Sequence, residues 1–174
     1  MMSLPLLRKR WGSKQILAGA LGVTIIGYLA LFMLSMIGVR AVAPLAATAF
    51  VIYIGFGLAT VLTTVFLADT VDYGEYKTGQ RNESVVFSMQ TFVVKLASAV
   101  SVLIAGVGID LIGLDDTVAV QSTGTLMGLR LLMVALPVAG LLFSIVYFMK
   151  KYRLTEEENA RISQALRQRE DEKR

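Results

Sequence analysis

Long apolar stretches separated by short polar segments dominate the pattern along this chain. Two of these stretches contain no charged residue, and two others contain one each, Lys95 and Arg130. Each stretch is long enough to cross a bilayer, because a hydrocarbon core of roughly 30 Å needs about 20 helical residues. We therefore expect an all-α integral membrane protein with transmembrane helices at residues 16–38, 44–68, 84–113 and 126–148.

The composition agrees with this assignment and excludes several kinds of chemistry. Of the 174 residues, 55% are hydrophobic and 17% are charged, whereas a soluble globular domain has about 25% charged residues. The chain contains no Cys and no His, which excludes disulfides, thiol chemistry and the usual zinc ligand sets. Its acidic residues lie near the predicted helix ends, so no acid–base pair converges at one depth. We expect no enzyme activity, no cofactor and no metal site.

Basic residues mark one side of the predicted membrane part. They gather before the first helix, between the second and third, and after the last, and they leave a net charge of +4. The positive-inside rule then places both termini and the 69–83 loop in the cytoplasm, which explains the charge better than nucleic-acid binding does. The chain accordingly divides into a basic cytoplasmic segment, a four-helix membrane part and a cytoplasmic tail, at residues 1–15, 16–149 and 150–174.

A few residues predict interruptions or ends of helices. Pro137 is expected to kink the last membrane helix. Gly55 and Gly57 are expected either to loosen the second helix or to let a neighbouring helix approach closely. Thr155 and Glu158 have capping-box spacing, which predicts a short tail helix that frays into solvent.

The 69–83 loop, DTVDYGEYKTGQRNE, is dense in charges of both signs. One interpretation is an ordinary solvated turn. The other is a gate, because Asp69 and Asp72 follow an apolar helix directly and Arg81 precedes the next one. Ion pairs at such a position can form in one conformation and break in another.

The third predicted helix carries Lys95 within a stripe of hydroxyl side chains. At 100° per residue, the stripe lies within about 80° of the helix surface and contains Ser84, Ser88, Thr91, Lys95 and Ser98. Lys95 lies about 18 Å along the helix from Glu83, near the middle of the bilayer. One interpretation is a snorkelling lysine. We favour a water-filled or ligand-filled cavity along the stripe, because intramembrane charges face such cavities.

No carboxylate of this chain is expected at the depth of Lys95. Either its counter-anion comes from helices outside this sequence, or desolvation keeps the lysine neutral. Arg130 lies nearer the opposite side of the membrane, and we expect it to anchor its helix by pairing with Asp110, Asp115 or Asp116.

One long segment of the chain resembles a known family of proteins. FLADTVDYGEYKTGQRNESVVFSMQTFVVK closely resembles the loop and eleventh helix of the glycoside-pentoside-hexuronide:cation symporters, the melibiose permease family within the major facilitator superfamily. The segments PLLRKRWGSKQ, GLRLLMVALP and FMKKYRLTEEENARI are also similar to that family. The resemblance implies that this chain corresponds to helices nine to twelve of a twelve-helix carrier.

The resemblance also implies roles for particular residues. Lys95 matches a lysine that serves both substrate binding and cation coupling, and Gln90 and Thr91 match residues that line the sugar site. A cytoplasmic gate is implied at Asp69, Asp72 and Arg81. The carboxylates that bind the cation belong to the amino-terminal half of the family.

The implied function is symport of a sugar or glycoside with Na⁺ or H⁺ by alternating access, in the inner membrane of a bacterium. The implied partners are the sugar, the coupling cation, the lipid bilayer and the missing amino-terminal helices. The helix before the loop contains no Trp to form an aromatic platform, which favours hexuronides, pentosides or sulfonated sugars over a melibiose-like substrate. The alternative is a four-helix membrane fragment or adaptor that does not transport.

Overall fold

The computed structural model describes residues 12–39, 41–115, 117–118, 120–152 and 156–171, and most of these residues are helical. Its membrane-length helices are α2 (Ser13–Ile37), α3 (Val42–Thr78) and α4 (Glu83–Ile112). A fourth runs from Thr123 to Lys151 and consists of α5 (Thr123–Arg130), the π-helical turn η1 (Leu131–Ala135) and α6 (Leu136–Lys151). The tail forms α7 (Glu156–Asp171). The expected all-α membrane fold is confirmed, with four helices long and apolar enough to span a bilayer.

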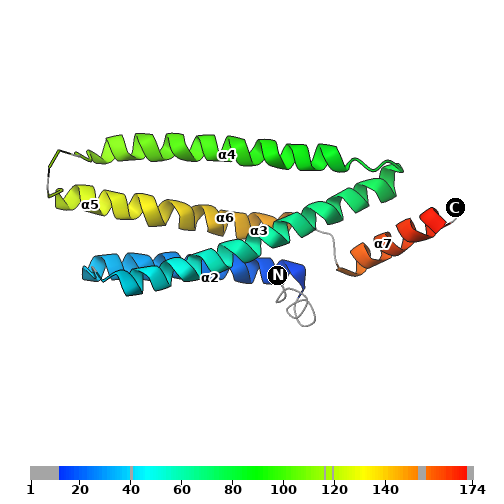
Figure 1. Ribbon diagram of the computed structural model, residues 1–174, viewed down its shortest axis with the longest axis horizontal. Helices are drawn as coiled ribbons and strands as arrows, with labels where there is room; N and C mark the ends of the chain where they lie inside the picture. The colour runs from blue at the N-terminus through cyan, green and yellow to red at the C-terminus, as the bar shows by residue number, and fades with distance from the viewer. Residues whose placement is uncertain (1–11, 40, 116, 119, 153–155, 172–174) are drawn as a thin grey trace.

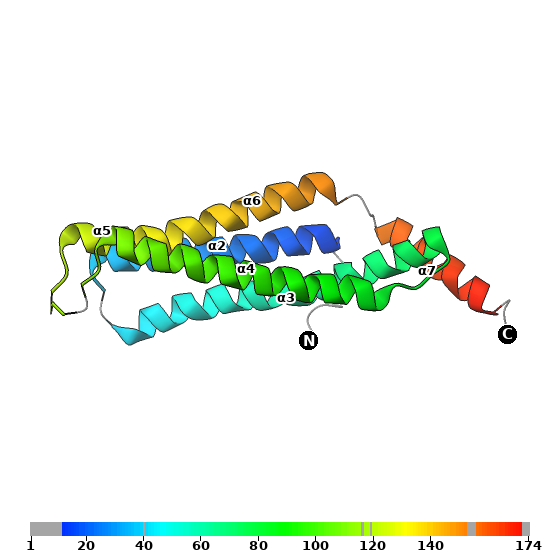
Figure 2. The ribbon, with the colours of Figure 1, turned by 90° about the horizontal axis from the view of Figure 1, so that it is seen from above.

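Successive membrane helices run in opposite directions along one long axis (Figure 1). The α2–α3 and α4–α5 connections lie at one end of the molecule. The α3–α4 turn lies at the other end, together with α7 (Figures 1 and 2). We call these the α2–α3 end and the α7 end. This arrangement agrees with the alternation of basic and non-basic connections in the sequence.

The helix α3 is longer than its apolar pattern predicted. It continues through the polar residues to Thr78 and ends at Gly79, whose φ of +73° suits glycine. The predicted 69–83 loop is therefore wrong: residues 69–78 form a polar extension of α3, and only 79–82 connect it to α4. Hydropathy detects the part of a helix that lies in lipid. It does not report how far the helix continues into water, and 37 residues extend about 55 Å.

The helices α2 and α3 approach each other closely at two glycines. A methyl group on Gly55 would collide with Thr24 Oγ1 and the carbonyl oxygen of Ala20, and one on Gly27 would collide with Ile52. Gly57, by contrast, has open space around it. The expected close approach of a neighbouring helix is thus confirmed at Gly55 alone of the pair, and it is the small-residue packing typical of membrane helices.

A compact apolar cluster joins α2, α3 and α6 toward the α7 end. Its buried members are Ile16, Leu17, Ala20, Ala59, Leu62 and Phe66. The rings of Phe148 in α6 and of Tyr152, the residue that caps this helix, complete it, with centroids 5.0 Å and 4.8 Å from that of Phe66. The ammonium of Lys14 lies 5.1 Å from the centroid of the Tyr152 ring. These contacts fix the start of α2 against the end of α6.

Pro137 does not end its helix. The π-helical turn Leu131–Ala135 comes directly before it, and α6 continues to Lys151. Proline lacks the N–H that would bond to the carbonyl four residues earlier, and a π-helical turn is one way for a helix to accommodate a disturbed hydrogen-bond ladder.

The tail helix α7 packs against α3. Ile162 of α7 and Val71 of the polar extension are both buried, with exposed fractions of 6% and 3%. The expectation of a tail that frays into solvent is therefore wrong for residues 156–171. The predicted capping residue Thr155 lies outside the described residues.

The helix α4 stands apart from the rest of the molecule. It has no buried residue, and its principal contacts are with α3 and α5, its neighbours in the chain. Toward the α2–α3 end it packs closely on the fourth membrane helix, where Gly108 faces Leu132 and Gly128 faces Ile112. Most of its apolar surface is thus open to lipid or to other helices.

Candidate functional site

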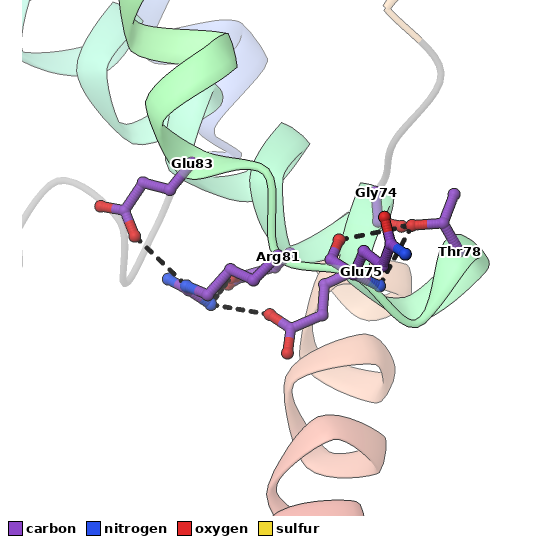
Figure 3. A network of polar contacts seen from close by, with 7 residues as sticks. Gly74, Glu75, Thr78, Arg81 and Glu83 are labelled. Carbon is purple, nitrogen blue, oxygen red and sulfur yellow. Dashed lines mark hydrogen bonds and ion pairs between the residues drawn. The ribbon is translucent and has the colours of Figure 1, made fainter.

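The guanidinium of Arg81 binds carboxylates of both flanking helices (Figure 3). Its Nη1 donates to Asp72 Oδ1 over 3.2 Å and to Glu75 Oε2 over 2.9 Å, and its Nε donates to Glu83 Oε2 over 3.2 Å. Asp72 and Glu75 are three residues apart in the polar extension, and therefore share one face of α3. Glu83 is the first residue of α4. Arg81 thus links the end of α3 to the start of α4.

The electrostatics of this network favour a permanently charged arginine. Hydrogen bonds to Glu75 and then to Glu83 raise the pKa of Arg81 further above its ordinary value. The Arg81 side chain is 52% exposed, so water screens these ion pairs and each adds little to stability. One cation facing three carboxylates leaves an excess of negative charge. Such a network can exchange partners at low cost when the helices move.

Asp69, the third residue expected at this gate, turns to a different partner. Asn159 of α7 donates a hydrogen bond from Nδ2 to Asp69 Oδ2 over 3.0 Å. Arg81 binds Glu75 in its place. The sequence did not single out Glu75 because its helical phase with Asp72 becomes visible only when residues 69–78 are recognised as helix.

The predicted substrate residues Gln90, Thr91 and Lys95 all lie on α4. Thr91 and Lys95 are four residues apart and share a face of the helix. Lys95 is exposed and forms no ion pair with any residue that the structure describes. Its position, twelve residues beyond Glu83, corresponds to about 18 Å along the helix.

The hydroxyl groups of the stripe around Lys95 bind within their own helix. Ser88 donates to the carbonyl of Val85, Thr91 to that of Phe87 and Ser98 to that of Val94, over 2.9 to 3.0 Å. The residues of α4 around Lys95 are exposed, in keeping with the absence of buried residues in α4.

Arg130 anchors its helix, but not to a carboxylate. Its Nε donates to Ser35 Oγ and its Nη2 to the carbonyl oxygen of Ser35, both over 2.9 Å. The expected pairing with Asp110 or Asp115 is wrong, and Asp116 lies outside the described residues. Asp110 is on α4, and Asp115 instead accepts hydrogen bonds from the backbone N–H and the hydroxyl of Thr117. Ser35, near the end of α2, is 95 positions from Arg130 in the sequence, so its proximity in space could not be predicted from the sequence.

In the described part of the chain, no group of three or more acidic side chains is placed to hold a metal ion.

The chain is similar to proteins of a known family. Residues 1–156 match the family described as MFS/sugar transport protein. The chain is 33% identical over 165 residues to an uncharacterized symporter of Bacillus subtilis (strain 168), covering 95% of this chain and 35% of that protein. It is 35% identical over 163 residues to the raffinose carrier protein of Pediococcus pentosaceus, covering 91% of this chain and 24% of that protein.

A third relative is a putative sulfoquinovose importer of Escherichia coli (strain K12), 34% identical over 121 residues, which cover 70% of this chain and 26% of that protein. This chain spans about a third of the length of the relatives it matches, or less. The relatives are named as carriers, permeases and symporters, not as enzymes. The resemblance to cation symporters is confirmed, and the chain belongs to the MFS/sugar transport protein family of multi-pass membrane proteins.

Proposed function

We propose that this chain is the carboxy-terminal part of a secondary transporter that carries a sugar or glycoside together with Na⁺ or H⁺ by alternating access. The observation that carries the proposal is Lys95, an ammonium deep in a membrane-length helix that has no carboxylate partner among the described residues. A lone charge at that depth costs several kcal/mol, on the order of 3 by insertion scales, unless a polar partner meets it.

A transport site meets this need. An open stripe of Ser88, Thr91, Lys95 and Ser98 would line the substrate path when further helices cover α4. Gln90 and Lys95 would donate hydrogen bonds to substrate oxygens, and the carboxylates that hold the cation would come from the helices beyond this chain. Binding of the coupling ion would then influence binding of the substrate, because both interact electrostatically with the ammonium of Lys95.

The substrate is best assigned as a sugar or glycoside carrying a negative charge, such as a hexuronide or a sulfonated sugar. An ammonium donates charge-assisted hydrogen bonds, about twice as strong as neutral ones, to a carboxylate or sulfonate. A relative named as a sulfoquinovose importer is in keeping with this choice, whereas relatives named as raffinose and lactose carriers represent the neutral alternative.

We assign the Arg81 network to the cytoplasmic gate, with both chain termini on that side of a bacterial inner membrane. Lys14, Lys150 and Lys151 flank the membrane helices at the α7 end, as the positive-inside rule requires of a cytoplasmic face. Arg81 joins α3 to α4 through its ion pairs there, so a change of partners would accompany relative movement of these helices.

The test is uptake by the carrier that contains this chain. Inverted or right-side-out vesicles would receive labelled glucuronides, sulfonated sugars and neutral glycosides under an imposed Na⁺ or pH gradient. We expect Lys95→Ala to abolish gradient-driven accumulation while membrane insertion is retained. Lys77→Ala is the matched control, because Lys77 is a cation of the polar extension that lies over the Tyr73 ring, 5.9 Å from its centroid. Normal accumulation by Lys95→Ala would refute the assignment.

A further inference from the structure

A cavity of about 470 Å³ lies at the α2–α3 end, between the end of α2, the start of α3 and the start of the fourth membrane helix. Most side chains around it are apolar, among them Leu31, Phe32, Leu45, Leu129 and Met133. Its polar wall consists of Ser35 and Arg130. It is separate from both Lys95 and the Arg81 network, which lie on α4 and at the α7 end.

Arg130 is held rigidly in this wall. The hydroxyl of Ser35 accepts a hydrogen bond from Nε, and its carbonyl oxygen accepts one from Nη2, both over 2.9 Å. The remaining contact of the guanidinium is from Nη1 to the thioether sulfur of Met36 over 3.6 Å, and a thioether is only a weak acceptor. Of the five N–H groups of arginine, those on Nη1 thus remain available to a strong acceptor.

The charge of Arg130 is not balanced by these contacts. No carboxylate in the described part of the chain pairs with it. Ser35 lies in the last turn of α2, where terminal carbonyls give a partial charge of about −0.5. That dipole explains how the guanidinium is oriented, but it leaves a net positive charge. An anion would balance this charge.

The depth of Arg130 suits an anion of the membrane surface. It lies seven residues beyond Thr123, about 10 Å into a helix of about 43 Å, and such a helix extends about 6 Å beyond a 30 Å core on each side. Arg130 thus lies only about one helical turn below the hydrocarbon boundary. A phosphate at the headgroup level is within reach of its side chain.

We propose that Arg130 and this cavity bind an anionic phospholipid of the leaflet at the α2–α3 end. The phosphate accepts hydrogen bonds from Nη1 of Arg130, and an acyl chain occupies the space between Leu31, Leu129 and Met133. A soluble anion is disfavoured as the natural occupant, because it would gain nothing from the apolar wall and would leave it exposed. A phospholipid satisfies both halves of the cavity, and the lipid would fasten α2 to α5.

The experiment compares lipid retention by the purified protein in native mass spectrometry. Phosphatidylglycerol and phosphatidylcholine of the same acyl composition are added separately. We expect the wild type to retain phosphatidylglycerol preferentially, and Arg130→Gln to lose about tenfold of that preference, since hydrogen bonds to charged groups are the stronger ones. Arg161→Gln removes an equal charge from the exposed face of α7 and should leave the preference intact.

Two further measurements keep the outcome decisive if Arg130→Gln disturbs packing. Leu126→Trp would fill the cavity without removing charge, and should lower retention of both lipids while circular dichroism shows unchanged helix content. Inorganic phosphate at millimolar concentration should not displace phosphatidylglycerol. Equal retention of phosphatidylglycerol by wild type and Arg130→Gln, or its displacement by phosphate alone, would overturn the proposal.

Discussion

Asn159 donates a hydrogen bond to Asp69 although the two residues are 90 positions apart in the chain. This bond ties α7 to the polar extension of α3. Arg169 adds a second link farther along both helices, donating to the carbonyl oxygen of Tyr76 over 3.4 Å while its guanidinium carbon lies 5.2 Å from the centroid of the Tyr76 ring. The tail therefore holds the same helix that presents Asp72 and Glu75 to Arg81.

Removing the first link should loosen α7 from α3. Asn159→Ala deletes a partly buried hydrogen bond to a carboxylate, with a loss of about 1 kcal/mol, and amides of α7 should exchange about fivefold faster. Hydrogen–deuterium exchange measured by mass spectrometry reports this rate directly. Gln164→Ala, on the exposed face of the same helix, is the control and should exchange as the wild type does. Unchanged exchange in Asn159→Ala would show that the other contacts of α7, such as those of Ile162 and Arg169, suffice to hold the tail.

The Arg81 network gives a prediction about arginine geometry. Arg81→Lys keeps the charge but replaces a planar group with several N–H donors by a single ammonium, which cannot serve Asp72, Glu75 and Glu83 together. The α3–α4 turn should then sample a wider range of geometries, although overall stability changes little because the site is exposed. Spin labels at residues 78 and 84 would show a broader distance distribution. The same labels in Lys77→Ala should match the wild type.

Much of the fold was predictable because a long stretch without charged residues is a reliable sign of a membrane helix. The observed bounds of α2 and α4 lie within a few residues of the predicted ones. The polar extension of α3 and the packing of α7 were missed for one physical reason. In water a helix is stabilised by particular side-chain contacts, such as those that bury Val71. Such contacts depend on the tertiary structure and cannot be recognised from hydropathy.

The candidate site was predictable in part. Arg81 and Asp72 were paired correctly, since only a short turn separates their helices. Asp69 and Arg130 were assigned partners within about 20 positions in the sequence, whereas their observed partners Asn159 and Ser35 are 90 and 95 positions away. Short polar contacts between distant helices depend on helix packing angles, which the pattern of one sequence does not determine.

The close contact of α2 and α3 should be sensitive to a single methyl group. Gly55→Ala would force that methyl against Thr24 and Ala20, and overpacking of this kind costs about 1–3 kcal/mol. Gly57→Ala is the matched control, because the space there is open and alanine favours helix by up to about 1 kcal/mol. Denaturation in mixed detergent micelles, followed by circular dichroism, should show the two variants shifted in opposite directions. A stabilised Gly55→Ala would contradict the observed packing.

Lys95 should matter to transport without supporting the fold of this chain. Because it forms no ion pair with the described residues, Lys95→Leu breaks no such contact. It should instead improve membrane insertion of α4 by about 3 kcal/mol. A glycosylation-based insertion assay on the 174-residue chain measures this change, with Ser101→Leu on another face as the control. Poorer insertion of Lys95→Leu would mean that the ammonium already has a partner within this chain.

The connection between α4 and α5 should respond to acid through Asp115. Hydrogen bonds from the hydroxyl and then the backbone N–H of Thr117 lower the pKa of Asp115 below its ordinary value of 3.8. A carboxylate whose pKa is lowered in the folded state stabilises the turn at pH values above its ordinary pKa. This contribution is lost as the pH falls through the lowered pKa. Thr117→Val removes the hydroxyl bond and keeps the backbone one, so the pKa should move back toward the ordinary value. Carbon-13 NMR titration of the Asp115 carboxyl would measure it, with Thr48→Val as a distant control. An unchanged titration in Thr117→Val would show that the backbone bond alone accounts for the shift.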